Sequence, residues 1–124
     1  MSCDYAVWCT EKQLTNVEAI KLYKQLCEGI TEGVVENDAV EVLYKELTTK
    51  HPEIDDVEEK DIDNSDVCPW SVKIDRSLGH LILCCVWSKS GYVYSLVKDL
   101  ARKYNLAFFD PQSGTVFYPF SSLT

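Results

Sequence analysis

Residues 78–87, Leu-Gly-His-Leu-Ile-Leu-Cys-Cys-Val-Trp, constrain the fold of this chain more than any other segment. Apolar side chains occupy both odd and even positions, so a strand formed here would present them to both faces of a sheet. Such a strand needs cover on both faces, which favours a place inside the sheet over a place at its edge. We therefore predict that residues 80–87 form an interior strand, directly followed by an amphipathic helix.

Sequence patterns on both sides of this strand predict the other elements. A capping box at Thr15 and Glu18 opens a first helix. A second helix begins with Asp38 as its cap and ends before Pro52. The remaining predicted elements are strands at 4–9, 71–75, 106–109 and 115–118 and a helix at 90–104, and we expect the tail after Pro119 to be loose.

The order strand, helix, helix, strand, strand, helix, strand, strand predicts the α+β class. It resembles a ferredoxin-like sandwich with an extra helix and a C-terminal hairpin. Right-handed crossovers would make the first and third strands parallel neighbours, in a mixed sheet with helices on one face. The other face would then need cover from a second copy of the chain, a loop or a partner. With 124 residues, the chain fits a single domain at 1–124, within which 53–69 form an acidic loop.

The acidic charge restricts the classes of partner. Twenty Asp and Glu residues against 12 Lys and Arg give a net charge of −8. Nucleic acid would be repelled, because its binding depends on cationic contacts to phosphate. No apolar run approaches the ~20 residues that cross a bilayer, and residues 1–5 lack the basic start of a secretion signal. We therefore expect a cytoplasmic protein that binds neither nucleic acid nor membranes and is attracted to basic proteins.

The six cysteines do not have the spacing of a metal site or of a disulfide-rich scaffold. Three of them lie within predicted strands, and the adjacent Cys84 and Cys85 would point to opposite faces of one strand. No Cys-x-x-Cys pair occurs, and His51 and His80 are far apart. We expect free thiols, with no metal and no cofactor.

A ligand pocket is one interpretation of the aromatic strand ends. If the two central strands were parallel, the tryptophans that end them would lie close together, beside the free backbone N–H groups of the following helix. The ligand-binding residues predicted on this basis are Trp8, Trp87, Ser88, Ser90 and Asp110. The alternative interpretation is that both indoles pack in the core, a serine caps the helix and the aspartate belongs to a turn.

A partner-binding surface is the second candidate site. The run of carboxylates in residues 53–66 is typical of a solvated acidic loop. It would speed encounter with a basic protein, while a neighbouring aromatic side chain would supply affinity. The partner-binding residues that we predict are Asp55, Asp56, Glu58, Glu59, Asp61 and Trp70.

Four short motifs carry a resemblance to a known set of proteins. They are Asp4-Tyr-x-Val-Trp8, Cys68-Pro-Trp70, Cys-Val-Trp-Ser88 and Phe-Phe-Asp-Pro-Gln112. Together they resemble a widespread family of small, mostly bacterial, uncharacterised α+β proteins, from which the cysteine-rich strand of this chain departs. By analogy, some small acidic α+β proteins of this kind are immunity proteins for toxins, which implies a toxin as the basic partner.

Two functional hypotheses follow. The first is a non-catalytic acidic module that binds a protein, as a toxin-immunity or inhibitor protein does. The second is a small-molecule-binding protein or weak enzyme with its pocket at the Trp8/Trp87 end of the sheet. No nucleophile–base pair or phosphate-binding loop stands out, so we expect no catalytic residues. A homodimer through the open sheet face remains a third alternative.

Overall fold

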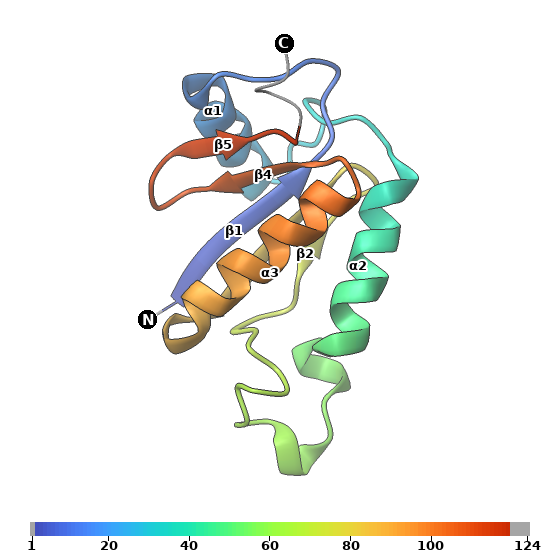
Figure 1. Cartoon of the computed structure of the whole chain (residues 1–124), viewed down its shortest axis with the longest axis vertical. Helices are drawn as coiled ribbons and strands as arrows, with labels where there is room; N and C mark the ends of the chain where they lie inside the picture. The colour runs from blue at the N-terminus through green and yellow to red at the C-terminus, as the bar shows by residue number, and fades with distance from the viewer. Residues whose placement is uncertain (1, 120–124) are drawn as a thin grey trace.

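Five strands and three α-helices lie along residues 2–119, the part of the chain that the computed structural model describes (Figure 1). The elements are β1 (Ser2–Trp8), α1 (Asn16–Cys27), α2 (Asp38–Lys50), β2 (Asp75–Arg76), β3 (His80–Val86), α3 (Ser90–Lys103), β4 (Ala107–Asp110) and β5 (Thr115–Phe117). Three single-turn 3-10 helices join them, η1 (Ile54–Asp56), η2 (Glu59–Asp61) and η3 (Trp87–Lys89). The expected loose tail lies outside the described residues. The α+β class is confirmed.

The strands form one antiparallel sheet in the order β2-β3-β1-β4-β5. β3 lies between β2 and β1, so the prediction of an interior strand is confirmed. It pairs with β1 along its whole length, from Ser2 opposite Val86 to Trp8 opposite His80. A further bridge joins Trp70 to Cys85, and this extends the cover of β3 on its β2 side.

The predicted direction of β3 is wrong, because β1 and β3 are antiparallel and the sheet is not mixed. A tight turn after Arg76 joins β2 to β3 and reverses the chain. The crossover from β1 therefore leads to β2, which runs parallel to β1, and β3 returns between them. This arrangement, with a fifth strand and no parallel neighbours, differs from the mixed sheet that we expected, and the ferredoxin-like order is not confirmed.

Helices cover both faces of the sheet, which corrects the expectation of one covered face. On one face, Tyr5 and Val7 of β1 pack with buried residues of α2 and α3. On the other, Ala6 and Trp8 pack with the buried side chains of α1. Figure 1 shows α3 in front of β1 and α1 behind the β4–β5 hairpin. The apolar row that we expected to be open is thus covered by the chain itself, so the argument for a homodimer through that face is removed.

Local signals were accurate at most element ends. The capping box of Thr15 and Glu18 is present. The second helix is capped by Asn37, not by Asp38, which is its first helical residue. Asn105 adopts a left-handed conformation after α3, with φ 59°. None of the helices within residues 2–119 is long and apolar enough to cross a bilayer.

Candidate functional site

The two tryptophans that we expected to meet lie at opposite ends of the sheet. Since β1 and β3 are antiparallel, Trp8 is opposite His80, whereas Trp87 follows the residue opposite Ser2. Trp8 is fully buried and stacks on Phe109, with 5.3 Å between ring centroids. The predicted aromatic pocket is therefore not formed, and for Trp8 the core interpretation holds.

The other residues predicted for that pocket have separate roles. Ser88 is exposed in η3, and the carbonyl of Ser90 accepts a hydrogen bond from the Tyr5 hydroxyl at 3.1 Å. The Asp110 carboxylate accepts hydrogen bonds from the backbone N–H and side-chain amide of Gln112 and from Ser113. These bonds close the turn between β4 and β5, so Asp110 has the turn role that we kept as the alternative.

The residues predicted to bind a partner lie in a projecting segment. Residues 53–69, the acidic segment, extend beyond the sheet at the bottom of Figure 1. Four of its predicted carboxylates are exposed and Asp61 is half-buried; the exposed four are Asp55, Asp56, Glu58 and Glu59. Among the described residues, the cations paired with this segment are Lys60 on Glu58, at 3.5 Å, and Lys89 on Asp66. Most of its negative charge is therefore uncompensated.

The ends of the acidic segment are held by buried polar contacts. The first is the carboxylate of Glu53, which accepts hydrogen bonds from the backbone N–H of Ile74, at 2.8 Å, and from the hydroxyl of Tyr44. Burial, and then the Glu53 carboxylate, raise the pKa of Tyr44 to about 12. Glu53 is thus a buried acceptor, in contrast to the exposed loop residue that we expected.

His51 provides the second set of contacts. Its ring nitrogens lie 2.9 Å from the carbonyl oxygen of Val67 and 2.8 Å from the hydroxyl of Tyr92. Its own carbonyl accepts the indole N–H of Trp70 at 2.9 Å. The two ends of the acidic segment are thereby joined to α2 and α3, so the carboxylates between them are held facing solvent.

The prediction that Trp70 contacts a partner is wrong. Its side chain is 2 % exposed, and its indole N–H is used inside the protein. The sequence signal was ambiguous, because a tryptophan beside an acidic run suits either an interface or a core. The backbone bridge between Trp70 and Cys85 favours the core, because it places Trp70 beside β3.

Trp87 is the more exposed of two aromatic side chains at this end of the molecule, the other being Tyr92. It is 54 % exposed, and Ile62 of the acidic segment is 53 % exposed. The ion pair between Lys89 and Asp66 connects the turn that holds Trp87 to the acidic segment. A groove of about 510 Å³ between them is lined by Ile62 and by Val86, the neighbour of Trp87. We call the exposed carboxylates of the acidic segment, with Ile62 and Trp87, the acidic surface.

The residues that hold this surface in place were not identified from sequence. Glu53 looks like one more member of an acidic run, and His51 looks like the end of a helix. Pro52 between them marks a chain reversal, which was the one available signal. Burial of both side chains depends on the tertiary position of β2 and α3, and no local pattern encodes it.

Metal-ligand and Ser-His-Asp geometries are the remaining chemical arrangements among the described residues. Within residues 2–119, no group of three or more His, Cys, Asp or Glu side chains is arranged to hold a metal ion. Ser77 Oγ lies 2.5 Å from Nδ1 of His80, whose Nε2 is 3.6 Å from Asp75. However, this serine also accepts the N–H of Gly79, and burial lowers the pKa of His80, which is 2 % exposed. We assign the three residues to the β2–β3 turn.

Comparisons with known proteins do not assign the chain to a family. Protein-family models, curated proteins and solved structures were compared with the chain, and none of them matched. The family resemblance inferred from the four motifs stays a prediction.

Proposed function

We propose that this protein is a cytoplasmic, non-catalytic module that binds a basic surface of a partner protein through its acidic surface. A toxin whose active site is basic is the partner that the immunity-protein analogy favours. The observation that carries the proposal is the acidic segment, whose uncompensated carboxylates are held outward by buried anchors at both ends.

The charge of the whole chain supports this function. A net charge of −8 creates a long-range field that attracts a cationic protein and raises the rate of encounter. The exposed charges contribute mainly to this rate, because water and salt screen them once the complex has formed.

Apolar anchors supply the affinity that such charges do not. Interface energy is concentrated in a few large side chains, among which tryptophan is enriched. Trp87 is half-exposed in the turn that Lys89 joins to the acidic segment, and Ile62 is an exposed apolar side chain on that segment. An anchor of this kind, rimmed by carboxylates, fits an apolar pocket surrounded by Lys and Arg.

The test is an affinity capture with matched baits. The first bait is the natural chain. The second carries D55N, D56N, E58Q and E59Q in the acidic segment. The control bait loses the same charge elsewhere, through substitutions at four exposed glutamates, Glu11, Glu28, Glu32 and Glu36. We expect a basic protein from the native cell to bind the natural and control baits and to be lost from the second.

The purified partner then allows a quantitative test. Its Kd for the natural chain should rise steeply with salt, and neutralising the four carboxylates should raise Kd about tenfold or more. If the second and control baits retain the partner equally, or if Kd does not change with ionic strength, the proposed function is wrong.

A further inference from the structure

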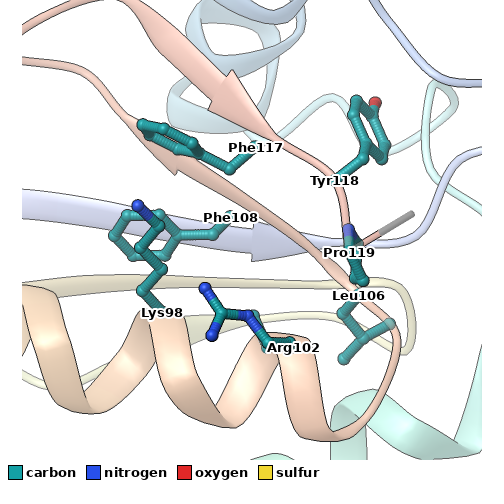
Figure 2. Close-up of a pocket in the computed structure, with 8 residues that line it drawn as sticks. Lys98, Arg102, Leu106, Phe108, Phe117, Tyr118 and Pro119 are labelled. Carbon is teal, nitrogen blue, oxygen red and sulfur yellow. The ribbon is translucent and has the colours of Figure 1, made fainter. Parts of the chain in front are cut away.

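A separate pocket lies between α3 and the β4–β5 hairpin. It has a volume of about 310 Å³, at the lower end of the range typical of small-molecule sites. Leu106, Phe108 and Phe117 provide apolar walls, and Lys98 and Arg102 reach into it from α3 (Figure 2). The acidic surface adjoins the start of α3, and Lys98 and Arg102 are eight and twelve residues after Ser90, about 12 and 18 Å along the helix. The two sites are therefore distinct.

The two cations of this pocket have no carboxylate partner among the described residues. By contrast, Lys103 on the same helix binds Glu46 at 2.9 Å. Within residues 2–119, the contacts of the Lys98 amino group are with aromatic residues: its Nζ lies 3.8 Å from the ring centroid of Phe117 and 3.3 Å from the hydroxyl of Tyr94. In a chain where acidic residues outnumber basic ones, 20 to 12, this pocket is a local concentration of positive charge.

The positive charges of Lys98 and Arg102 repel each other, and a bound anion would offset this repulsion. Lys98 and Arg102 are four residues apart, so their charges lie on the same face of α3 and repel each other weakly. A bound anion would turn that repulsion into attraction to both. The guanidinium fork of Arg102 suits the two oxygens of a carboxylate, and Lys98 adds a point charge.

The apolar walls define the rest of the ligand. Phe108 and Phe117 face each other across neighbouring strands, with ring centroids 6.1 Å apart. Leu106 and Phe108, 2 % and 1 % exposed, form the floor, and the half-buried Phe117 offers apolar surface next to the two cations, which suits a ring attached to an acid group. We propose that this pocket binds a small organic carboxylate with a flat apolar body, such as an aryl carboxylate.

The test uses 2-naphthoate as the probe and 2-naphthamide as its uncharged analogue. Each is titrated into the full chain and followed by amide and methyl NMR shifts. We expect 2-naphthoate to bind with a Kd below about 1 mM, and the amide to bind at least about tenfold more weakly. The shifts should be largest at Ala101, Leu106 and Phe117, which line the pocket.

Variants of the two cations measure how much each charge contributes to binding of 2-naphthoate. R102Q and K98Q should each raise the Kd for 2-naphthoate about tenfold, because each removes one cation that contacts the carboxylate. K103Q is the matched control, since this lysine is on the same helix but pairs with Glu46 outside the pocket. It should leave the Kd unchanged.

Four results would overturn the proposal. The first is no binding at a probe concentration of about 5 mM, where even a weak complex would form. The second is NMR shifts confined to the acidic surface, and the third is equal affinity for the acid and the amide. The fourth is contact between residues 120–124 and Phe117 in the protein without probe. The comparison of acid with amide needs no variant, so it decides the question even if a substitution disturbs folding.

Discussion

Trp70 and Trp87 adjoin the same strand but have opposite environments. Trp70 is bridged to Cys85 within β3 and donates its indole N–H to the carbonyl of His51. Trp87 comes one residue after β3 ends, and half of its surface is in water. A buried, hydrogen-bonded indole contributes to folding, whereas an exposed one beside uncompensated charge is available to a partner.

Substitution should separate these roles. We expect Trp70→Phe to lower the free energy of unfolding by about 2 kcal/mol, because it leaves the carbonyl of His51 without its donor and loses buried volume. Trp87→Ala should change stability by less than about 0.5 kcal/mol but weaken partner binding about tenfold or more. Urea unfolding and titration with the captured partner measure the two effects. Val17→Ala, at an exposed position of α1, is the control for binding. An equal loss of binding in that control would contradict the role of Trp87.

The acidic segment depends on neighbouring elements for its shape. It has only single-turn helices of its own, and its exposed charges would favour an extended, mobile chain. Contacts to α2, β2 and α3 oppose this, through Glu53 at its start and through His51, which binds Val67 near its end. A segment fixed in this way presents its carboxylates with less loss of entropy on binding.

Glu53 provides the test of this anchoring. Glu53→Ala leaves the N–H of Ile74 without an acceptor in a buried site, which should cost about 1–3 kcal/mol. The acidic segment should then exchange its amide hydrogens faster and be cleaved faster by protease. Glu53→Gln keeps an acceptor for that N–H and should restore most of the protection. Asp56→Ala, at an exposed carboxylate, should have little effect. Unchanged exchange in Glu53→Ala would show that other contacts hold the segment.

At the scale of the whole molecule, two layers of helices enclose a sheet that contains several buried acid groups. Cys85 lies between the sheet and the α2–α3 layer, and burial followed by the neighbouring Cys3 raises its pKa from 9.0 to about 12. Burial also raises the pKa values of Cys68 and Tyr5. These groups stay protonated in the folded protein at pH values where the unfolded chain ionises them.

Stability should therefore fall in alkaline solution. Below pH 9 the thiol of Cys85 is protonated in both states, so its contribution is fully present. Between pH 9 and about 12 only the unfolded chain releases the proton, which lowers the free energy of unfolding by up to ~1.4 kcal/mol per pH unit. Urea unfolding between pH 8 and 11 should show this slope, and Cys85→Ala should reduce it. If the slope is the same in that variant, the thiol does not ionise on unfolding as described.

Much of the fold could be read from the chain, because its signals are local. The apolar pattern of β3, the capping box of Thr15 and the stripe of α3 each depend on neighbours in sequence, and each element formed where it was expected. Strand 71–75 is the exception. Only Asp75–Arg76 forms β2, since Glu53 takes up the N–H of Ile74 that a longer strand would have paired.

The candidate site was predicted only in part, for the same reason. A run of carboxylates is visible in any conformation, so the acidic surface could be proposed from sequence. Its aromatic anchor could not, because the position of Trp87 depends on the direction of β3 relative to β1. The pocket of Lys98 and Arg102 forms where α3 lies next to β5, and no spacing along the chain predicts that these two elements are neighbours.

By itself, the sequence determined the types of element, the interior place of β3 and the acidic charge of residues 53–66, because these follow from hydropathy period, capping and ionisation. Only the tertiary structure decided that β1 and β3 are antiparallel, that helices cover both faces, and that Trp70 is buried while Trp87 is exposed. Strand direction results from the path of the whole chain, and the reversal at the β2–β3 turn exchanges the positions of the two ends of β3, which separates Trp87 from Trp8.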